Sequence, residues 1–388
     1  MKTHDVLVVG AGPAGSTAAL HLARAGFSVA IAEREVFPRG KVCGEFVSGP
    51  SWTLLDALGV ADALRPHAGP PVEAVGFHGG EVIAAAPMPG TRQGRAIGRH
   101  RLDAVLLDAA IAAGAHAFQP AIVQDIVTES GLQRAHLRTA GESEIVVARH
   151  VIDAHGSWLR GPFAPLPSAS PRELLGFKAR FADAALPRGL MPLVVFPGGY
   201  GGLVETGAGL VSFSCCIRRD VMRELREGGD TAGAAVFAHV LRHCRGVREA
   251  LGGARLADGE GWRGAGPIHP GVRPLTRPGV LAVGNAAGEA HPLVAEGISM
   301  ALQSGWLAAH HLVKTLAGER TPAAGARAYA RDWRAHFLLR IRASQAFAAI
   351  ADRGTSWMGA AVSLYPGLLT AGALLSGKSG AVPALDPR

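Results

Sequence analysis

The sequence predicts an α/β protein with a parallel sheet, a second antiparallel sheet and helices at the C-terminal end. Three observations lead to this prediction. The first is a strand–helix–strand pattern at the start of the chain, with an apolar run at 6–9, a helical stretch at 14–25 and a buried strand at 28–32. The second is the region 173–218, where short apolar runs are broken by turns, as in antiparallel sheets. The third is a return of helical periodicity after residue 320.

The length of 388 residues is more than one compact core usually holds, so we expect two structural parts. Strands expected at 144–152 and 280–283 and a helix at 99–113 return the chain to the first sheet. The expected division is a nucleotide-binding domain of residues 1–71, 98–170 and 258–320, a substrate domain of 72–97 and 171–257, and a helical segment of 321–388.

Composition excludes several classes of protein. Hydrophobic residues make up 48% of the chain, which excludes disorder, and the net charge of +8 raises the question of an anionic partner. The arginines are scattered and form no basic stripe, so we expect no nucleic acid. The four cysteines form no C-x-x-C pair and no zinc spacing occurs, so we expect reduced thiols and no metal. No secretory signal opens the chain, and we expect a cytoplasmic protein.

A glycine-rich turn follows the first strand directly and opens the first helix. It reads Gly10-Ala11-Gly12-Pro13-Ala14-Gly15, the G-x-G-x-x-G pattern of Rossmann-type dinucleotide-binding folds. There the first glycine allows the tight turn, the second lets a pyrophosphate approach the backbone, and the third lets helix and strand pack closely. Glu33 ends the second strand, where a carboxylate accepts the ribose hydroxyls. The competing interpretation is a plain glycine turn with a surface glutamate.

Three further segments resemble one family of flavoproteins. Residues 34–45 (REVFPRGKVCGE) contain an R-x-K-x-C-G element, residues 151–160 (VIDAHGSWLR) resemble a D-G fingerprint, and residues 279–288 (GVLAVGNAAG) resemble a G-D motif that continues to Ile298. Together they are similar to the glutathione-reductase-2 type flavoproteins, the class of geranylgeranyl reductases, aromatic hydroxylases and flavin halogenases. The resemblance covers roughly residues 1–320 and implies non-covalently bound FAD in a Rossmann-type domain.

The resemblance also implies roles for individual positions. The glycine turn would hold the pyrophosphate, Arg34 would lie near the adenine and Arg99 near the phosphates. The backbone N–H groups of Gly297 and Ile298 would face the pyrimidine edge of the flavin, where negative charge accumulates on reduction. The full expected cofactor set is Gly10, Ala11, Gly12, Pro13, Ala14, Gly15, Glu33, Arg34, Lys41, Val42, Arg99, Asp153, Gly284, Asn285, Gly297 and Ile298.

Departures from the family pattern reduce the number of reactions that we expect this chain to catalyse. Asn285 stands where the family usually has aspartate, and the paired tryptophans of the halogenases are absent, which argues against halogenation. The tryptophan motif of prenyl reductases is replaced by residues 196–202 (FPGGYGG), which resemble bacterial flavoproteins associated with polyketide synthesis that hydroxylate alkylated phenols. We therefore expect a monooxygenase acting on a lipophilic aromatic substrate. The alternatives are a reductase of prenyl or other carbon–carbon double bonds and an FAD-stabilised binding protein without redox activity.

The absence of a second dinucleotide-binding motif indicates how the electron donor binds. No second G-x-G-x-x-G occurs in a strand–turn–helix setting, so we expect NAD(P)H to act transiently, with a partner reductase as the alternative.

The expected catalytic residues are Cys43, His291 and Arg39. Cys43 would lie beside the flavin as a proton donor, with Lys41 and Arg39 close enough to lower the pKa of its thiol. His291 is a second candidate for proton transfer. Simpler interpretations remain open: the cysteine is a small residue packed on the cofactor, and the histidine caps a turn.

The apolar segment 357–375 is interrupted by Pro366, Gly367 and Gly372, which makes it too broken for a membrane-spanning helix. Two interpretations stand side by side. It is either a hydrophobic lid or weak peripheral membrane contact that admits a lipophilic substrate, or a set of ordinary helices covering the first domain.

Overall fold

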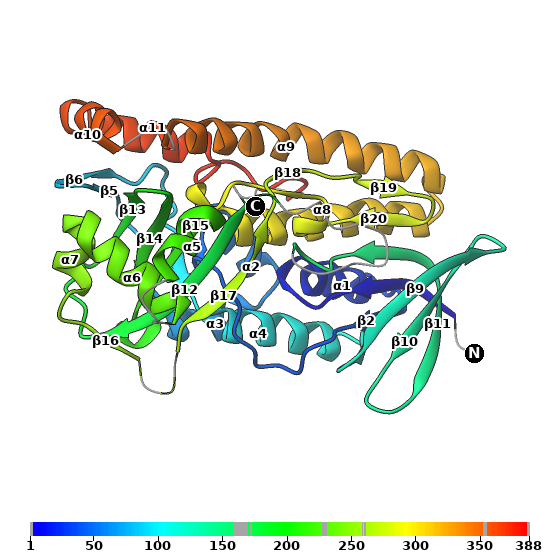
Figure 1. Cartoon of the computed structure of the whole chain (residues 1–388). Coiled ribbons are helices and arrows are strands. Elements are labelled where there is room, and N and C mark those ends of the chain that lie inside the picture. Colours follow the sequence, from blue (N-terminus) through cyan, green and yellow to red (C-terminus); the bar gives the residue numbers. More distant parts are fainter. Residues whose placement is uncertain are drawn as a thin grey trace.

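The computed structural model describes residues 3–157, 170, 173–226, 231–257, 259, 261–351 and 355–385, with the side chains of 355–357 excepted. The last residues of the expected D-G fingerprint, 158–160, lie outside this range. The described chain builds two large sheets, with a layer of long helices along one side of both (Figure 1).

The first sheet is the predicted dinucleotide-binding sheet. Its strand order is β19-β20-β11-β1-β2-β8, and the β1–β2, β1–β11, β2–β8 and β11–β20 pairs are all parallel. The strands are β1 (Thr3–Val9), β2 (Val29–Ala32), β8 (His116–Phe118), β11 (Ser143–Asp153), β19 (Thr276–Arg277) and β20 (Val280–Ala282). The carboxyl ends of β1, β2 and β11 therefore meet at one edge.

Alternating side chains of β1 divide the core of this domain into two clusters. Val6 and Val8 pack with three helices, α1 (Pro13–Arg24), α4 (Arg99–Ala112) and α8 (Gly297–Leu316). Leu7 packs on the other face, which is covered by an antiparallel extension of strands β9 (Ile122–Glu129) and β10 (Leu132–Arg138). The sequence analysis did not anticipate this extension.

The second sheet has the order β16-β12-β15-β14-β13-β5-β6, with β17 paired to β12, and all of its pairs are antiparallel except β13–β5. Its strands are β5 (Ala74–Gly79), β6 (Val82–Pro87), β12 (Leu174–Ala182), β13 (Leu190–Phe196), β14 (Gly199–Glu205), β15 (Val211–Arg218), β16 (Arg255–Leu256) and β17 (Arg263–Ile268). Strand β17 was expected in the first domain, but its hydrogen bonds to β12 place it here. Cys215 and Cys216 are neighbours on β15 and point to opposite faces of the sheet.

The remaining elements up to α8 are short strands and helices that lie around the two large sheets. They are the strands β3 (Phe46–Val47), β4 (Ala68–Pro71), β7 (Arg95–Ile97), β18 (Gly271–Val272) and β21 (Gly288–Glu289), and the helices α2 (Gly49–Ala57), α3 (Ala61–Leu64), α5 (Arg219–Leu225), α6 (Ala232–His243) and α7 (Arg245–Leu251). The last three helices cover the outer face of the second sheet.

The C-terminal helices form the upper layer of Figure 1. Helix α9 (Pro322–Ala351) packs along α8, whereas α10 (Thr355–Leu364) and α11 (Gly367–Leu375) lie against β5 and β6. Among the described residues no single helix has the length and apolarity to cross a membrane. The stretches Met358–Leu364 and Gly367–Leu375 meet those criteria only as a pair, and that pair is bent by 110°.

Helix α8 approaches α1 so closely that one contact point requires glycine. A Cβ atom on Gly305 would lie 2.1 Å from the carbonyl oxygen of Ala14. We predict that Gly305→Ala lowers the free energy of unfolding by about 1–3 kcal/mol, because the two helices must move apart. Helix propensity alone would change stability by about 1 kcal/mol in the opposite direction.

Urea denaturation measures the outcome, and the sign of the change distinguishes the two effects. Gly253→Ala is the matched control, because a Cβ there has no heavy atom within 4 Å. A stabilised Gly305→Ala protein would contradict the close contact.

Candidate functional site

A cavity of about 870 Å³ is lined by residues of both sheets and extends to α10 and α11, which line part of it. One end is formed by the glycine turn and the end of β2, and the other by the inner face of the second sheet. It is lined by fifteen residues singled out in the sequence: Gly10, Gly12, Pro13, Ala14, Glu33, Arg34, Arg39, Lys41, Val42, Cys43, Arg99, Gly284, Asn285, Gly297 and Ile298. The motifs therefore converge on one site, although they lie far apart in the chain.

The glycine turn leaves no room for larger residues. Gly10 has a φ of +99°, and a Cβ there would lie 2.6 Å from the carbonyl oxygen of Ala154. A Cβ on Gly15 would lie 1.9 Å from the carbonyl oxygen of Gly10. Gly12 precedes α1, whose N-terminus has no side-chain cap. The turn therefore presents an open helix N-terminus, which suits a phosphate group.

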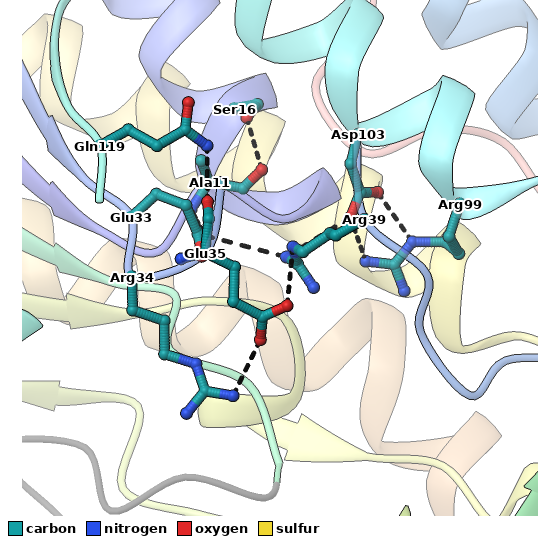
Figure 2. A network of polar contacts seen from close by, with 9 residues as sticks. All are labelled: Ala11, Ser16, Glu33, Arg34, Glu35, Arg39, Arg99, Asp103 and Gln119. Carbon is teal, nitrogen blue, oxygen red and sulfur yellow. Dashed lines mark hydrogen bonds and ion pairs between the residues drawn. The ribbon is translucent and has the colours of Figure 1, made fainter. Parts of the chain in front are cut away.

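Glu33 is fixed by the backbone at the end of β2 (Figure 2). Its carboxylate accepts hydrogen bonds from the N–H of Ala11 at 2.8 Å and from the N–H of Glu35 at 2.9 Å. Each carboxylate oxygen keeps a further acceptor position. Glu33 is thus held rigidly where a ribose would bind, while Arg34 lies at the surface in an ion pair with Glu35.

Three cationic side chains gather between Glu33 and α4. Arg99 forms a bidentate contact with Asp103 at 2.7 Å, and Arg39 lies 3.5 Å from Asp103 and 3.8 Å from Glu33 (Figure 2). Burial would lower the pKa of Arg99, but Asp103 outweighs it and raises that pKa. Burial, together with repulsion by Arg99 and Arg39, lowers the pKa of Lys41 to about 8.

These residues fit a dinucleotide such as FAD. Three closely spaced cations suit a pyrophosphate, and the Nε atom of Arg39 is buried and makes no hydrogen bond within the described chain. The closely packed glycine turn and the open N-terminus of α1 form the cradle in which the pyrophosphate would lie. When FAD is bound, the glycine turn, Lys41, Arg39 and Arg99 would hold its phosphates, and Glu33 its ribose.

Arg39 lies in the cofactor groove. Its guanidinium lies between the carboxylates of Glu33 and Asp103 and over the ring of Phe37, and the two carboxylates balance its buried charge. These contacts suit a phosphate-binding role. Arg39, Cys43 and His291 stay as the predicted catalytic residues.

Asn285 sits in a polar cluster beside the cofactor groove. Its amide donates to Ser157 Oγ at 2.5 Å and to Glu289 Oε1 at 3.0 Å, and Arg273 lies 3.4 Å from the other Glu289 oxygen. Burial raises the pKa of Glu289 despite Arg273. Both N–H groups of the Asn285 side-chain amide are thus engaged in hydrogen bonds. The side-chain oxygen, Oδ1, is left to accept a hydrogen bond from a ligand.

Asp153 lies buried at the end of β11 and bonds to the ring of its neighbour His155. It stands beneath the cavity wall, so its contribution is to fix the loop at Ala154 that the glycine turn packs against.

Helix α8 begins at Gly297, so the N–H groups of Gly297 and Ile298 lie at a helix N-terminus that opens into the cavity. Ala295 precedes this turn in a left-handed conformation with a φ of +52°. Glu296 is fully buried and pairs with Lys378 at 3.3 Å, which arrives from the C-terminal segment. Burial raises the pKa of Glu296, against the attraction of Lys378. Neither this lysine nor its ion pair was anticipated from the sequence.

Cys43 is half-buried at the cavity wall, and its contacts differ from the expected ones. The sulfur accepts the N–H of Glu45 at 3.5 Å and lies near the guanidinium of Arg99, whose pKa it helps to raise. The sequence analysis had named Lys41 and Arg39 as its cationic partners. Glu45 has a φ of +61° and forms a buried ion pair with Lys178, which fixes the turn that carries Cys43.

His291 lies one residue behind the cavity wall, not at its surface. Its Nε2 is 3.4 Å from the hydroxyl of Tyr200, and its backbone N–H donates to Ser344. Burial lowers the pKa of His291 to about 4, so the ring is neutral at pH 7. Tyr200 lines the cavity itself, and burial raises the pKa of its phenol. The sequence analysis missed Tyr200, although the glycines around it in residues 198–202 mark a strand that other groups approach closely.

Comparisons with known proteins agree with this site. Residues 3–161 match the family model for an FAD binding domain. The menaquinone reductase of Mycolicibacterium smegmatis is 28% identical over 328 residues, which cover 79% of this chain and 75% of that protein. The match to an FAD binding domain, with the cradle described above, identifies FAD as the cofactor.

Two solved structures share the fold. The myxobacterial chondrochloren halogenase has a TM-score of 0.77 at 23% identity, covering 89% of this chain and 83% of its own. A geranylgeranyl bacteriochlorophyll reductase-like protein from Thermoplasma acidophilum has a TM-score of 0.71 at 20% identity, covering 100% and 94%. The same architecture therefore occurs in halogenases and in reductase-like proteins.

We predict that FAD affinity falls as pH rises through the pKa of Lys41. Below about pH 8 the ammonium is charged and attracts the diphosphate, whereas above it the charge is lost in the FAD-free protein. Apoprotein titrated with FAD at about pH 7 and about pH 9.5 should show roughly tenfold weaker binding at the higher pH. Lys41→Arg should abolish the pH dependence, and an equal slope in that variant would refute the assignment to Lys41.

We predict that Asn285→Asp retains FAD but lowers the flavin midpoint potential at a pH at which the new carboxylate is ionised, because that charge opposes the negative charge gained on reduction. The new carboxylate would lie within hydrogen-bonding distance of Glu289, so at lower pH the pair shares a proton and its pKa rises. Stability of the variant relative to the parent is therefore retained at low pH and lost as the pH rises through the raised pKa of the pair, and the potential falls over the same pH range.

Dye-coupled titration measures the potential, and thermal unfolding across that pH range measures the stability. The double variant Asn285→Asp/Glu289→Gln carries one carboxylate and should recover the pH profile. An unchanged or higher potential in Asn285→Asp would overturn the prediction.

Proposed function

We propose that this FAD-dependent oxidoreductase is a monooxygenase that hydroxylates a lipophilic phenol or similar aromatic compound, with NAD(P)H as the reductant and dioxygen as the oxidant. The observation that carries the proposal is Tyr200 at the cavity wall, backed by His291, in the part of the cavity that apolar side chains of the second sheet and the C-terminal helices line.

This pair suits a phenolic substrate. In the tautomer of neutral His291 that carries its proton on Nδ1, Nε2 accepts the hydroxyl proton of Tyr200, which leaves the Tyr200 oxygen as an acceptor toward the cavity. A phenol bound there donates its own O–H to Tyr200, and electron density on its ring rises. Reduced FAD supplies the reactivity toward dioxygen. Electron-rich rings are the ones that such chemistry attacks.

The rest of the cavity supports a substrate with an apolar body. Phe77, Leu193 and Leu293 line it from the second sheet and the loop before α8, and Phe347, Met358 and Leu369 line it from the C-terminal helices. These walls exclude water from the reacting groups and accommodate an alkyl chain.

NAD(P)H enters the proposal as a transient reductant. The described cofactor groove suits one dinucleotide, and the sequence contains one G-x-G-x-x-G in a strand–turn–helix setting. Electrons would therefore reach the flavin from a molecule that binds and leaves.

The second candidate is a double-bond reductase, favoured by the similarity to a menaquinone reductase. In that case Cys43, which lines the cavity, is the predicted proton donor. Its sulfur accepts the N–H of Glu45 and lies near the Arg99 guanidinium, and both would stabilise the thiolate that proton donation leaves behind.

We predict that one labelled oxygen atom appears in the product when alkylated phenols are turned over with NAD(P)H under heavy-isotope dioxygen. Tyr200→Phe should lower the hydroxylation rate by about one hundredfold while FAD content stays unchanged, because only the hydroxyl is removed. Tyr365→Phe is the matched control on an exposed tyrosine.

Mass spectrometry of the product decides between the two candidates. Product that forms without oxygen and gains two hydrogens across a double bond would exclude hydroxylation. It would establish the reductase instead, and Cys43→Ser would then be the variant that loses activity.

A further inference from the structure

Helices α10 and α11 carry a cluster of exposed apolar side chains, which we call the apolar ridge. Leu364 and Tyr365 are 74% and 69% exposed, at the bend between the two helices. The complete ridge comprises Leu364, Tyr365, Leu368, Leu374 and Leu375, all more than half exposed. In Figure 1 it belongs to the orange and red helices at one end of the upper layer. Such a cluster marks an interaction surface.

The apolar ridge is continuous with the cavity. Leu368 and Leu375 are 52% and 53% exposed, and both also line the cavity. One side of each of these leucines therefore faces solvent and the other faces the interior. A lipophilic molecule that passes between α10 and α11 stays in contact with apolar side chains throughout.

Charge is distributed in a way that suits an anionic surface. Residues 355–380 contain one charged side chain, Lys378, which is buried against Glu296. On α9, next along the same layer, Arg331, Arg334 and Arg342 are exposed, and Asp332 pairs with Arg331. The ridge thus has no carboxylate of its own, and the helix that precedes it in the same layer carries exposed arginines.

We propose that the apolar ridge docks on an anionic lipid bilayer and that the cavity takes its substrate directly from that bilayer. The two helices are bent by 110° and lie against β5 and β6, so they rest in the plane of the membrane. The leucines enter the boundary between headgroups and acyl chains, Tyr365 lies at the headgroup level, and the arginines of α9 contact lipid phosphates.

A bilayer fits these observations better than a second protein does. A protein partner seated on the ridge would cover Leu368 and Leu375, where the ridge meets the cavity, whereas fluid lipid leaves this route passable. The proposal does not depend on the reaction catalysed, since lipid binding is measured without turnover.

Co-sedimentation of the FAD-loaded protein with vesicles tests the docking. We expect binding to vesicles of equimolar phosphatidylglycerol and phosphatidylcholine and weaker binding to phosphatidylcholine alone. Leu364→Asp/Leu374→Asp should weaken binding at least about tenfold, because both side chains lose their apolar contact and gain charge. Neither leucine lines the cavity. Arg334→Gln/Arg342→Gln should lower the preference for anionic vesicles by about fivefold per arginine.

The matched control is Ile111→Asp/Val127→Asp, which replaces two exposed apolar side chains on α4 and β9, away from the ridge. It should bind vesicles like the parent. FAD absorbance and thermal unfolding verify that each variant is folded.

An environment-sensitive fluorophore on Ser363→Cys provides a second measurement that keeps the leucines intact. Its emission should shift to shorter wavelength with the mixed vesicles, and the same label on Ser143→Cys should not respond. Equal binding by the parent and the Leu364/Leu374 variant would overturn the proposal. So would a parent dimer in sedimentation analysis that the same variant converts to monomer without any vesicle binding, since the ridge would then pair two copies.

Discussion

The first turn of α1 is the point on which the rest of this structure depends. Gly15 lies against the carbonyl oxygen of Gly10 and the side chain of Ala154, the Ala14 carbonyl lies against Gly305 of α8, and the Ala14 side chain lies against Gly284. Three segments from distant parts of the chain therefore approach a single helical turn. Close packing of this kind is what small residues permit, and it positions the ends of β1, β11 and β20 around the same phosphate-binding N-terminus.

The side chains around that turn carry more positive than negative charge, and the phosphates of the ligand would supply the balancing negative charge. Arg39, Lys41 and Arg99 are nearly buried and share Asp103 and Glu33 as their main carboxylate neighbours. The depressed pKa of Lys41 reflects burial first and the two arginines second. A diphosphate relieves this repulsion, so the groove gains stability from the molecule it binds.

The sequence was most informative where local pattern and chemistry coincide. The strand–helix–strand start, Glu33 and the segment around Asn285 could be recognised because each motif carries its own turn residues. The extension formed by β9 and β10 was missed, since its alternation is weak and Ile122 and Val127 are exposed. Partners brought together by the fold could not be predicted at all: Tyr200 with His291, Arg99 with Cys43, and Glu296 with Lys378 each join elements whose proximity no local pattern encodes.

The ion pair between Glu296 and Lys378 has a consequence for biosynthesis. These residues are 82 positions apart, and the lysine also donates to the carbonyl oxygen of Val294, at the turn before α8. When a nascent chain has left the ribosome only as far as α11, it already contains the glycine turn and α8. Lys378 has not yet emerged, so the Glu296 carboxylate lacks its counterion. The pocket around the N-terminus of α8 is therefore completed after the Rossmann-type domain has been synthesised, and full assembly of the holoenzyme belongs to the time after the C-terminal segment has folded back onto it.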